Sequence, residues 1–190
     1  MEKAAALAEL ATHIAACQQC PLYQTAHRAV PGDGNPNAEI VFVGEGPGAK
    51  EDETGLPFVG AAGKFLNELL ESIHLKREDV FIGNVVKHRP PGNRDPLPHE
   101  LHACTPWLDK QIDIIQPRLI VTLGRFSMAH FLGEGFTISK IHGQPKRRNN
   151  QVVMPMYHPA AALYQGSLRE VMKKDFKKIP KLLTVLKKES

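Results

Sequence analysis

The chain has 190 residues, of which 42% are hydrophobic and 23% are charged, with a formal charge of +4. This length suits one well-buried domain, so we expect a single domain over residues 1–190 whose mild positive charge is compatible with a nucleic-acid partner. Apolar runs long enough to cross a membrane and a signal-peptide pattern are both absent, and three cysteines do not suggest a disulfide framework, so we predict a cytoplasmic monomer that does not bind membranes.

The predicted elements begin with a helix over residues 2–16, a stretch rich in alanine and leucine. This helix leads into a C-x-x-C motif formed by Cys17 and Cys20, and Pro21 stops any continuing helix. The C-x-x-C spacing places two thiolates within reach of one metal ion or cluster. A redox role would need a thioredoxin-type context, which this stretch lacks.

The next element is a short apolar run, Ile40–Val43, which predicts a buried strand. It ends in the turn Gly44–Gly48, where three glycines and a proline let backbone amides approach a ligand and where Glu45 supplies a carboxylate. A second loop bounded by glycines carries Phe58, a candidate ligand-facing ring. The alternative is an ordinary strand end, an acidic surface turn and a core phenylalanine.

The first of these loops also satisfies the loose dinucleotide-binding pattern G-x-G-x-x-G/A. That pattern should open a helix at once, whereas residues 49–60 contain Pro57 and show no helical apolar period. We therefore expect loop there and disfavour nucleotide binding. The G-x-x-x-x-G-K-[ST] pattern of a phosphate-binding loop is also absent from the sequence.

The rest of the chain alternates helical and extended patterns. Asn84 lies in an otherwise apolar strand, so its amide must find partners in the backbone or in a ligand. His158 follows the last strand. The predicted elements are a helix over 63–73, a strand over 80–86, a basic proline-rich loop over 87–96, a helix over 98–115, a strand over 119–124, a helix over 125–132, a basic loop-rich segment over 133–150, a strand over 152–155, and a closing helix over 167–188 that Pro180 interrupts or bends.

Four strands that alternate with helices predict an α/β domain with a central four-stranded, mostly parallel sheet flanked by helices. Three of the strand ends carry Glu45, Asn84 and His158. In open α/β sheets, ligands bind outside the carboxyl ends of the strands. We therefore expect these three side chains to share one site.

Four motifs in this order closely resemble the iron–sulfur-containing uracil-DNA glycosylases, usually called family 4: GEGPG, GLPFVG, GNVVKHRPPGNRDP and YHPAA. The resemblance runs from about Cys17 to about Ala161. It implies an enzyme of base excision repair that flips uracil out of single- or double-stranded DNA and hydrolyses the N-glycosidic bond. It also implies that the loop over residues 159–163 presses on the DNA.

The resemblance assigns roles to six residues of this chain. Glu45 and His158 would be catalytic, with His158 donating a hydrogen bond to uracil O2 and Glu45 orienting water or stabilising the sugar cation. Phe58 would stack on the flipped base, and Asn84 would read its amide edge. The residues implied in uracil binding are Gly44, Gly46, Phe58, Asn84 and His158.

The first motif departs from the best-known branch of uracil-DNA glycosylases at two positions. That branch has Asp where this chain has Gly46, and Tyr where this chain has Gly48. Without the Asp, the group that activates water is unassigned. Without the Tyr, the usual block against the methyl group of thymine is missing. Family 4 shares both absences.

The resemblance also implies a metal centre. Family 4 members carry four cysteine ligands, and this chain matches three of them: Cys17, Cys20 and Cys104. The fourth should follow Lys87, where this chain has His88. We expect these three cysteines and His88 to hold a [4Fe–4S] cluster, with a tetrahedral zinc ion as the alternative. His99 or His102 could replace His88, or His88 could contact phosphate beside a cluster with three protein ligands.

Two other functions stay open. One is a non-catalytic or covalently cross-linking binder of uracil-containing DNA, because a relative that cross-links to such DNA resembles this chain in having V-K-H here. That relative also carries an inserted basic loop with a nucleophilic histidine, for which residues 90–98 leave no room. The other is a zinc-bearing nucleic-acid module without a base pocket.

Overall fold

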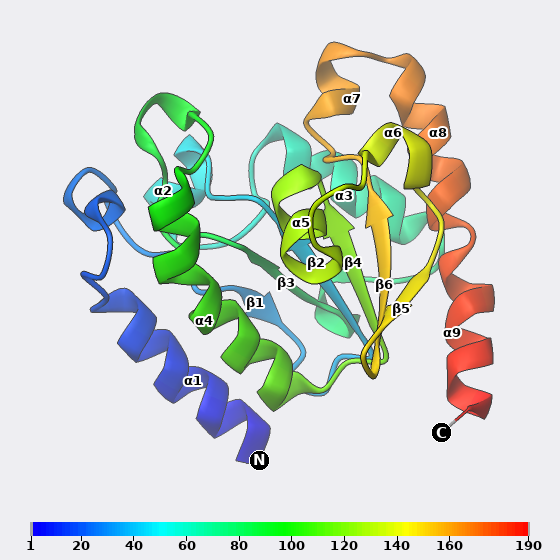
Figure 1. Cartoon of the computed structure of the whole chain (residues 1–190), viewed down its shortest axis with the longest axis horizontal. Coiled ribbons are helices and arrows are strands. Elements are labelled where there is room, and N and C mark those ends of the chain that lie inside the picture. Colours follow the sequence, from blue (N-terminus) through cyan, green and yellow to red (C-terminus); the bar gives the residue numbers. More distant parts are fainter. Residues whose placement is uncertain (1, 190) are drawn as a thin grey trace.

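The computed structural model describes residues 2–189 and is built around a six-stranded mixed sheet with the order β1-β3-β2-β4-β6-β5 (Figure 1). Neighbours among β3, β2, β4 and β6 run parallel, and β1 and β5 pair antiparallel at the two edges. The strands are β1 (Asp33–Gly34), β2 (Ile40–Gly44), β3 (Phe81–Asn84), β4 (Leu119–Leu123), β5 (Lys146–Arg148) and β6 (Gln151–Met156).

The predicted α/β class and its parallel central strands are confirmed, and the two edge strands are additional. Strand β1 has only two residues and β5 is a run of three basic residues, so neither carries an apolar pattern. Each forms because the longer strand beside it has backbone N–H and C=O groups that would otherwise lack partners. For β5 that neighbour is β6, which it reaches through the tight turn at Asn149 and Asn150.

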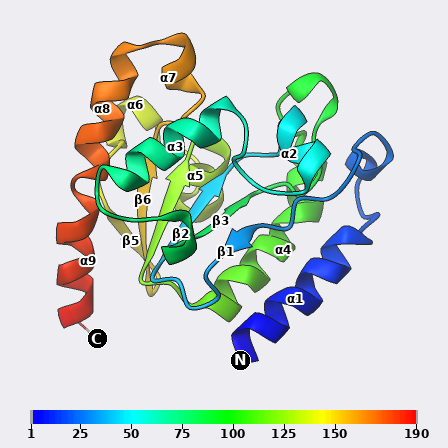
Figure 2. The ribbon, with the colours of Figure 1, turned by 180° about the vertical axis from the view of Figure 1, so that it is seen from behind.

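Helices cover both faces of the sheet, with α1, α4 and α5 on one side and α3, α8 and α9 on the other (Figures 1 and 2). Among residues 2–189, none of these helices combines the length and the apolar composition needed to cross a membrane. The helices are α1 (Glu2–Ala15), α2 (Ala49–Thr54), α3 (Ala61–Glu71), α4 (Pro98–Ile115), α5 (Arg125–Leu132), α6 (Ile138–Ile141), α7 (Ala161–Tyr164), α8 (Ser167–Phe176) and α9 (Ile179–Lys188), with short 3₁₀ turns η1 (Pro21–Gln24), η2 (Arg77–Asp79) and η3 (Pro91–Asn93).

The expectation of loop throughout residues 49–60 is wrong, because α2 begins directly after Gly48. This helix is six residues long, mostly polar, and ends at Gly55, whose φ of 78° is left-handed. It is too short to show an apolar period. The predicted interruption at Pro180 is confirmed, since α8 ends at Phe176 and α9 begins at Ile179 with Pro180 in its first turn, where proline is tolerated.

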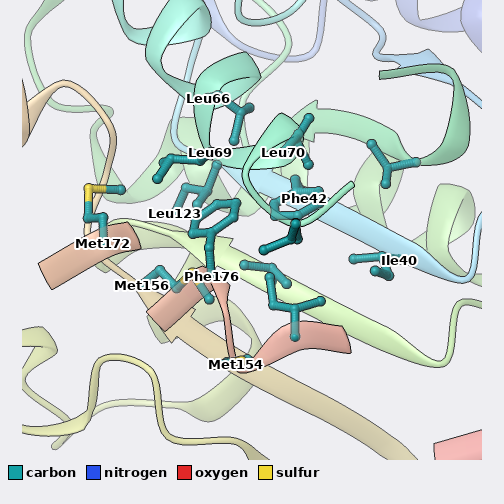
Figure 3. Close-up of a cluster of buried hydrophobic side chains, with 14 of the residues drawn as sticks. Ile40, Phe42, Leu66, Leu69, Leu70, Leu123, Met154, Met156, Met172 and Phe176 are labelled. Carbon is teal, nitrogen blue, oxygen red and sulfur yellow. The ribbon is translucent and has the colours of Figure 1, made fainter. Parts of the chain in front are cut away.

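The core has two layers, because successive strand residues point to opposite faces of the sheet. Ile40 and Phe42 of β2 pack toward α3, α8 and α9, whereas Val41 and Val43 pack toward α4 and α5. Figure 3 shows the first layer, in which the rings of Phe42 and Phe176 stack with centroids 5.7 Å apart. This layer holds the parallel strands rigidly, so their carboxyl ends keep fixed relative positions.

Candidate active site

The carboxyl ends of β2, β3 and β6 meet at one edge of the sheet. Gly44 ends β2 directly opposite Asn84, which ends β3, and the amide of Val85 donates to the carbonyl of Gly44 at 3.1 Å. His158 follows β6 by two residues. The structure thus brings Glu45, Asn84 and His158 together in the wall of a cavity of about 470 Å³, which we call the base cavity.

Asn84 lies in this wall with its side-chain amide buried. It is 1% exposed, and Oδ1 has no hydrogen-bond partner among the described residues. A buried acceptor without a partner costs free energy, so an unpaired one facing a cavity suggests a ligand that donates to it. Gly44 leaves the necessary room, because a Cβ atom there would lie 2.4 Å from Oδ1 of Asn84.

Phe58 forms an aromatic wall of the base cavity. Its ring stacks on that of His158 with centroids 5.5 Å apart and planes at 27°. The backbone of Phe58 has a φ of 51°, a left-handed conformation that is a genuine outlier for a bulky residue. Such strain persists when the surroundings over-determine it.

Two charged side chains hold this strained loop. On one side, Glu51 accepts the amides of Val59 and Gly60 at 2.9 Å each and that of Gly48 at 3.1 Å. On the other side, Arg77 donates to the carbonyls of residues 57 and 58 at 2.6 and 3.0 Å. The loop therefore keeps its shape through hydrogen bonds within the protein.

His158 is held as a neutral ring with a defined tautomer. The amide of Ala160 donates to Nδ1 at 3.1 Å, so the proton of the neutral ring lies on Nε2. Burial lowers the pKa of His158 to about 4, although the carboxylate of Glu51 partly opposes this shift. At neutral pH, His158 is therefore an uncharged hydrogen-bond donor in the wall of the base cavity.

Glu45 is anchored at the start of α5. Its Oε1 accepts the amide of Phe126 at 3.2 Å. Burial raises the pKa of the Glu45 carboxyl, while the first amides of α5 and the guanidinium of Arg125 act in the opposite direction. Gly124 is required beside it, since a Cβ atom there would lie 2.3 Å from Glu45 Oε1. The carboxylate lines the base cavity from this anchored position, and Gly46 lines it next to Glu45.

The rim of the base cavity carries paired charges and one exposed ring. Arg94 binds the buried carboxylate of Glu100 through hydrogen bonds of 2.8 and 2.6 Å, and Asp95 pairs with Arg125. Tyr164 ends α7 and is 92% exposed. It extends the segment over residues 159–163 that we predicted to contact DNA.

The three cysteines gather in a separate region, which we call the cysteine corner together with His88. Cys17 Sγ accepts the indole N–H of Trp107 at 3.3 Å, and Cys104 Sγ accepts the amide of Lys87 at 3.2 Å. Burial raises the pKa of Cys104 to about 11, and the nearby thiols of Cys20 and Cys17 add to the rise. Cys20 and Trp107 pack against the buried cluster that contains Cys104, and Trp107 also contacts Cys17, so the three cysteines share one region although they come from distant parts of the sequence.

His88 belongs to the same corner. It is 6% exposed, burial lowers its pKa, and it lines a cavity of about 140 Å³ together with Cys17. His99 and His102, the two alternatives, are exposed on α4. Within residues 2–189, no three His, Cys, Asp or Glu side chains lie close enough together to hold a metal ion. The assignment of His88 as a ligand stays a prediction.

Sequence reasoning missed three residues that support the site. Glu51 is one of several acids after the glycine-rich turn, and its position three residues after Gly48 is typical of a residue that caps a helix start. Lys87 is a charge at the end of an apolar run, which is a signal for a buried lysine. Arg77 carried no signal in the sequence, because its partners are backbone carbonyls from a distant loop.

The fold and the base cavity together define a class of protein. A cavity at the carboxyl ends of parallel strands, with an aromatic wall, a buried unpaired amide and a neutral histidine donor, suits a planar polar ring. The chain matches the family model described as the Uracil DNA glycosylase superfamily over residues 31–183, and it belongs to that superfamily.

Three relatives resemble the chain over most of its length, and each is named a type-4 uracil-DNA glycosylase. The protein from Sulfurisphaera tokodaii is 50% identical over 185 residues, covering 93% of this chain and 84% of the relative. The protein from Archaeoglobus fulgidus is also 50% identical over 185 residues, covering 93% and 92%. The protein from Saccharolobus solfataricus is 46% identical over 184 residues, covering 92% and 85%.

Proposed function

We propose that this chain is a uracil-DNA glycosylase, a hydrolase that removes uracil from DNA by cutting the N-glycosidic bond and so starts base excision repair. Membership of the superfamily and the names of its relatives support this function. The observation that carries it is the unpaired, buried Oδ1 of Asn84 in the base cavity. A flipped uracil would supply the missing donor through its N3–H group.

The aromatic wall of the cavity and the side-chain amide of Asn84 would recognise the base. Phe58 would stack on the flipped base, and Asn84 would pair with its N3–H and O4 edge. Gly44 leaves room for the base between Asn84 and Phe58, because a Cβ atom there would lie 2.4 Å from Asn84 Oδ1. Gly46 would line the bound base with its backbone. Since Glu51 and Arg77 hold the Phe58 loop before DNA binds, little of the binding free energy is lost in ordering it.

Bond cleavage leaves negative charge on uracil and positive charge on the sugar. His158 would donate from Nε2 to uracil O2, and this hydrogen bond strengthens as charge develops on the leaving base. A neutral donor suits this task, because it holds its proton at neutral pH and does not need to be charged in the buried cavity. Glu45 would stabilise the sugar cation or orient the attacking water.

We also propose that Cys17, Cys20, Cys104 and His88 hold a [4Fe–4S] cluster, with zinc as the alternative. The donor set supports this proposal, because three cysteines share one region and the buried imidazole of His88 lines a cavity with Cys17. Binding would have to draw these side chains closer together. Such a group would join the segment after α1 to α4 and to the segment after β3, which supports folding. None of these four residues is among the described residues that line the base cavity, so we assign them no step in bond cleavage.

The decisive experiment incubates the protein with uracil-containing oligonucleotides, single-stranded and duplex, followed by alkali cleavage and a denaturing gel. We expect cleavage at uracil and release of free uracil over repeated turnovers by a monomer. Binding without uracil release would instead support the non-catalytic alternative, and a protein–DNA adduct that survives denaturation would support the cross-linking one. Iron, sulfide and zinc analysis of the purified protein decides between cluster and zinc ion.

A further inference from the structure

Lys87 is a charged side chain inside the protein. It is 1% exposed, although lysine is almost never fully buried without a partner. Its Nζ donates to the backbone carbonyl of Asn84 at 2.8 Å and to Oε1 of Gln111 at 2.7 Å. Both acceptors are uncharged, and although Cys104 and Asp109 favour the ammonium electrostatically, burying it is costly.

The pairing of β1 with β3 explains why the carbonyl of Asn84 needs a donor. The two strands are antiparallel, with Asp33 opposite Ile82. The pairing ends at Asp33, so no residue of β1 lies opposite Asn84. The segment before β1 next contacts the β3 side through Val30, whose amide donates to the carbonyl of Lys87 at 2.7 Å.

Two backbone bonds bracket this interruption. The amide of Asn35 donates to the carbonyl of Val80 at 2.9 Å, and that of Val30 donates to the carbonyl of Lys87. Hydrogen-bonded positions recur at every second residue of a continuous antiparallel pair, so these two donors, an odd number of residues apart, do not share one register. Asn84 lies between the two acceptors, and its carbonyl therefore falls at a gap in the strand pairing.

Lys87 and Gln111 fill this gap with side chains. Gln111 donates from Nε2 to the carbonyl of Pro31 at 2.7 Å and accepts Lys87 Nζ at Oε1. Lys87 then donates to the carbonyl of Asn84. Three consecutive hydrogen bonds thus connect the two backbone carbonyls in place of the missing strand pairing.

These bonds fix the peptide group that follows Asn84. Its carbonyl accepts from Lys87, and its amide, on Val85, donates to the carbonyl of Gly44 at 3.1 Å. The side-chain Oδ1 of Asn84 has no partner among the described residues. The direction of the carboxamide therefore depends on the main chain, which Lys87 holds at one end.

We propose that Lys87 is a positioning residue for base recognition, whose buried side chain donates to the backbone carbonyl of Asn84 where the strand pairing is interrupted and thereby aims the carboxamide of Asn84 into the base cavity. The proposal rests on the proposed role of Asn84 in reading uracil. Lys87 acts through Asn84 and does not touch the base.

A double-mutant cycle tests this proposal. Lys87→Met removes the donor with little change in side-chain volume, and we expect kcat/KM for uracil release to fall about tenfold, the size expected for one charged hydrogen bond. In the Asn84→Ala background, where no carboxamide remains to be aimed, Lys87→Met should change kcat/KM less than about twofold. A similar loss in both backgrounds would show a merely structural role and overturn the proposal.

A rescue variant and a control complete the experiment. Lys87→Gln keeps an N–H donor without the charge, so its kcat/KM should stay at least about threefold above that of Lys87→Met. Lys181→Met, at an exposed lysine of α9, is the matched control and should leave kcat/KM unchanged. Equal losses in Lys87→Gln and Lys87→Met would overturn the hydrogen-bond explanation.

Two further comparisons keep every outcome decisive. If Lys87→Met does not fold, as judged by thermal unfolding, Gln111→Leu replaces it in the same cycle, and additivity with Asn84→Ala again contradicts the proposal. Asn84→Ala alone should lower kcat/KM at least about tenfold, because the base edge then loses its partner. Wild-type activity in that variant would overturn the role of Asn84, which is distinct from a failure of Lys87.

Discussion

The base cavity and the cysteine corner are built in opposite ways. The cavity holds its shape through hydrogen bonds within the protein: Glu51 and Arg77 hold the Phe58 loop, and Ala160 sets the tautomer of His158. The polar side chains of Asn84 and His158 line an open cavity. A ligand therefore meets a site that is already formed.

The cysteine corner holds its groups near each other without closing on a common centre. Cys17 and Cys104 accept hydrogen bonds from Trp107 and from the backbone of Lys87, and burial disfavours the thiolate forms by raising the pKa of Cys104 to about 11. A bound cation would reverse that preference, since it stabilises thiolates. The difference teaches that one site is organised by the fold, whereas the other is organised by the group it would hold.

The largest expected effect tests the first half of this comparison. His158→Ala should lower kcat by roughly 30- to 1,000-fold, or about 2 to 4 kcal/mol, the range for removing one donor to a developing oxyanion. KM should change little, because the interaction strengthens only in the transition state. Steady-state kinetics on a uracil oligonucleotide measures both constants. An effect on KM alone would mark His158 as a DNA-positioning residue.

The second prediction fills the base cavity. In Gly44→Ala, the new Cβ would lie 2.4 Å from Asn84 Oδ1 and 2.5 Å from Cζ of Phe58. Both side chains, which we propose to contact the base, must then shift, so we expect kcat/KM to fall at least about tenfold, in line with the cost of overpacking. Gly166→Ala is the control, because a Cβ there meets nothing within 4 Å. Full activity of Gly44→Ala would mean that the cavity adapts and is not rigidly formed.

The third prediction concerns the cysteine corner. His88→Cys replaces a neutral ligand by an anionic one, so a bound cluster should become harder to reduce. We expect uracil release within about twofold of wild type, since the corner lies outside the base cavity, and a lower reduction potential by redox titration. The matched control, His99→Cys, should leave the potential unchanged. A large loss of activity in His88→Cys would contradict the claim that the cysteine corner takes no part in uracil release.

The smallest expected effect concerns pH. The folded-state pKa of His158 is lowered to about 4, below its unfolded value, so the unfolded chain takes up the proton first. The contribution of His158 to stability is therefore complete at neutral pH and is lost as pH falls toward 4. Allowing for partial exposure, we expect about 1 kcal/mol, or about 2 to 4 °C in Tm. His158→Gln should weaken the fall in Tm between neutral and acidic pH, and an unchanged slope would contradict this origin.

The sequence by itself determined the class of fold and the approximate location of the site. Apolar runs identified the parallel strands, and the polar residues at their ends, Glu45, Asn84 and His158, do meet in one cavity. The location could be predicted because the carboxyl ends of parallel strands lie at one edge of the sheet. Residues that directly follow such strands in the sequence therefore lie near one another. Ordered motifs around these residues also pointed to the family that the comparisons confirm.

Tertiary structure alone decided how the site is held. The edge strand β1 and the helix α2 carry no periodic signal, and they form because neighbouring segments pair with them or cap them. Arg77 binds carbonyls about twenty residues away, and Lys87 donates to the carbonyl of Asn84, where the pairing with the neighbouring segment is interrupted. A backbone carbonyl is the same at every residue, so the sequence does not mark which of them lacks a partner. That becomes visible only when the register between strands is known.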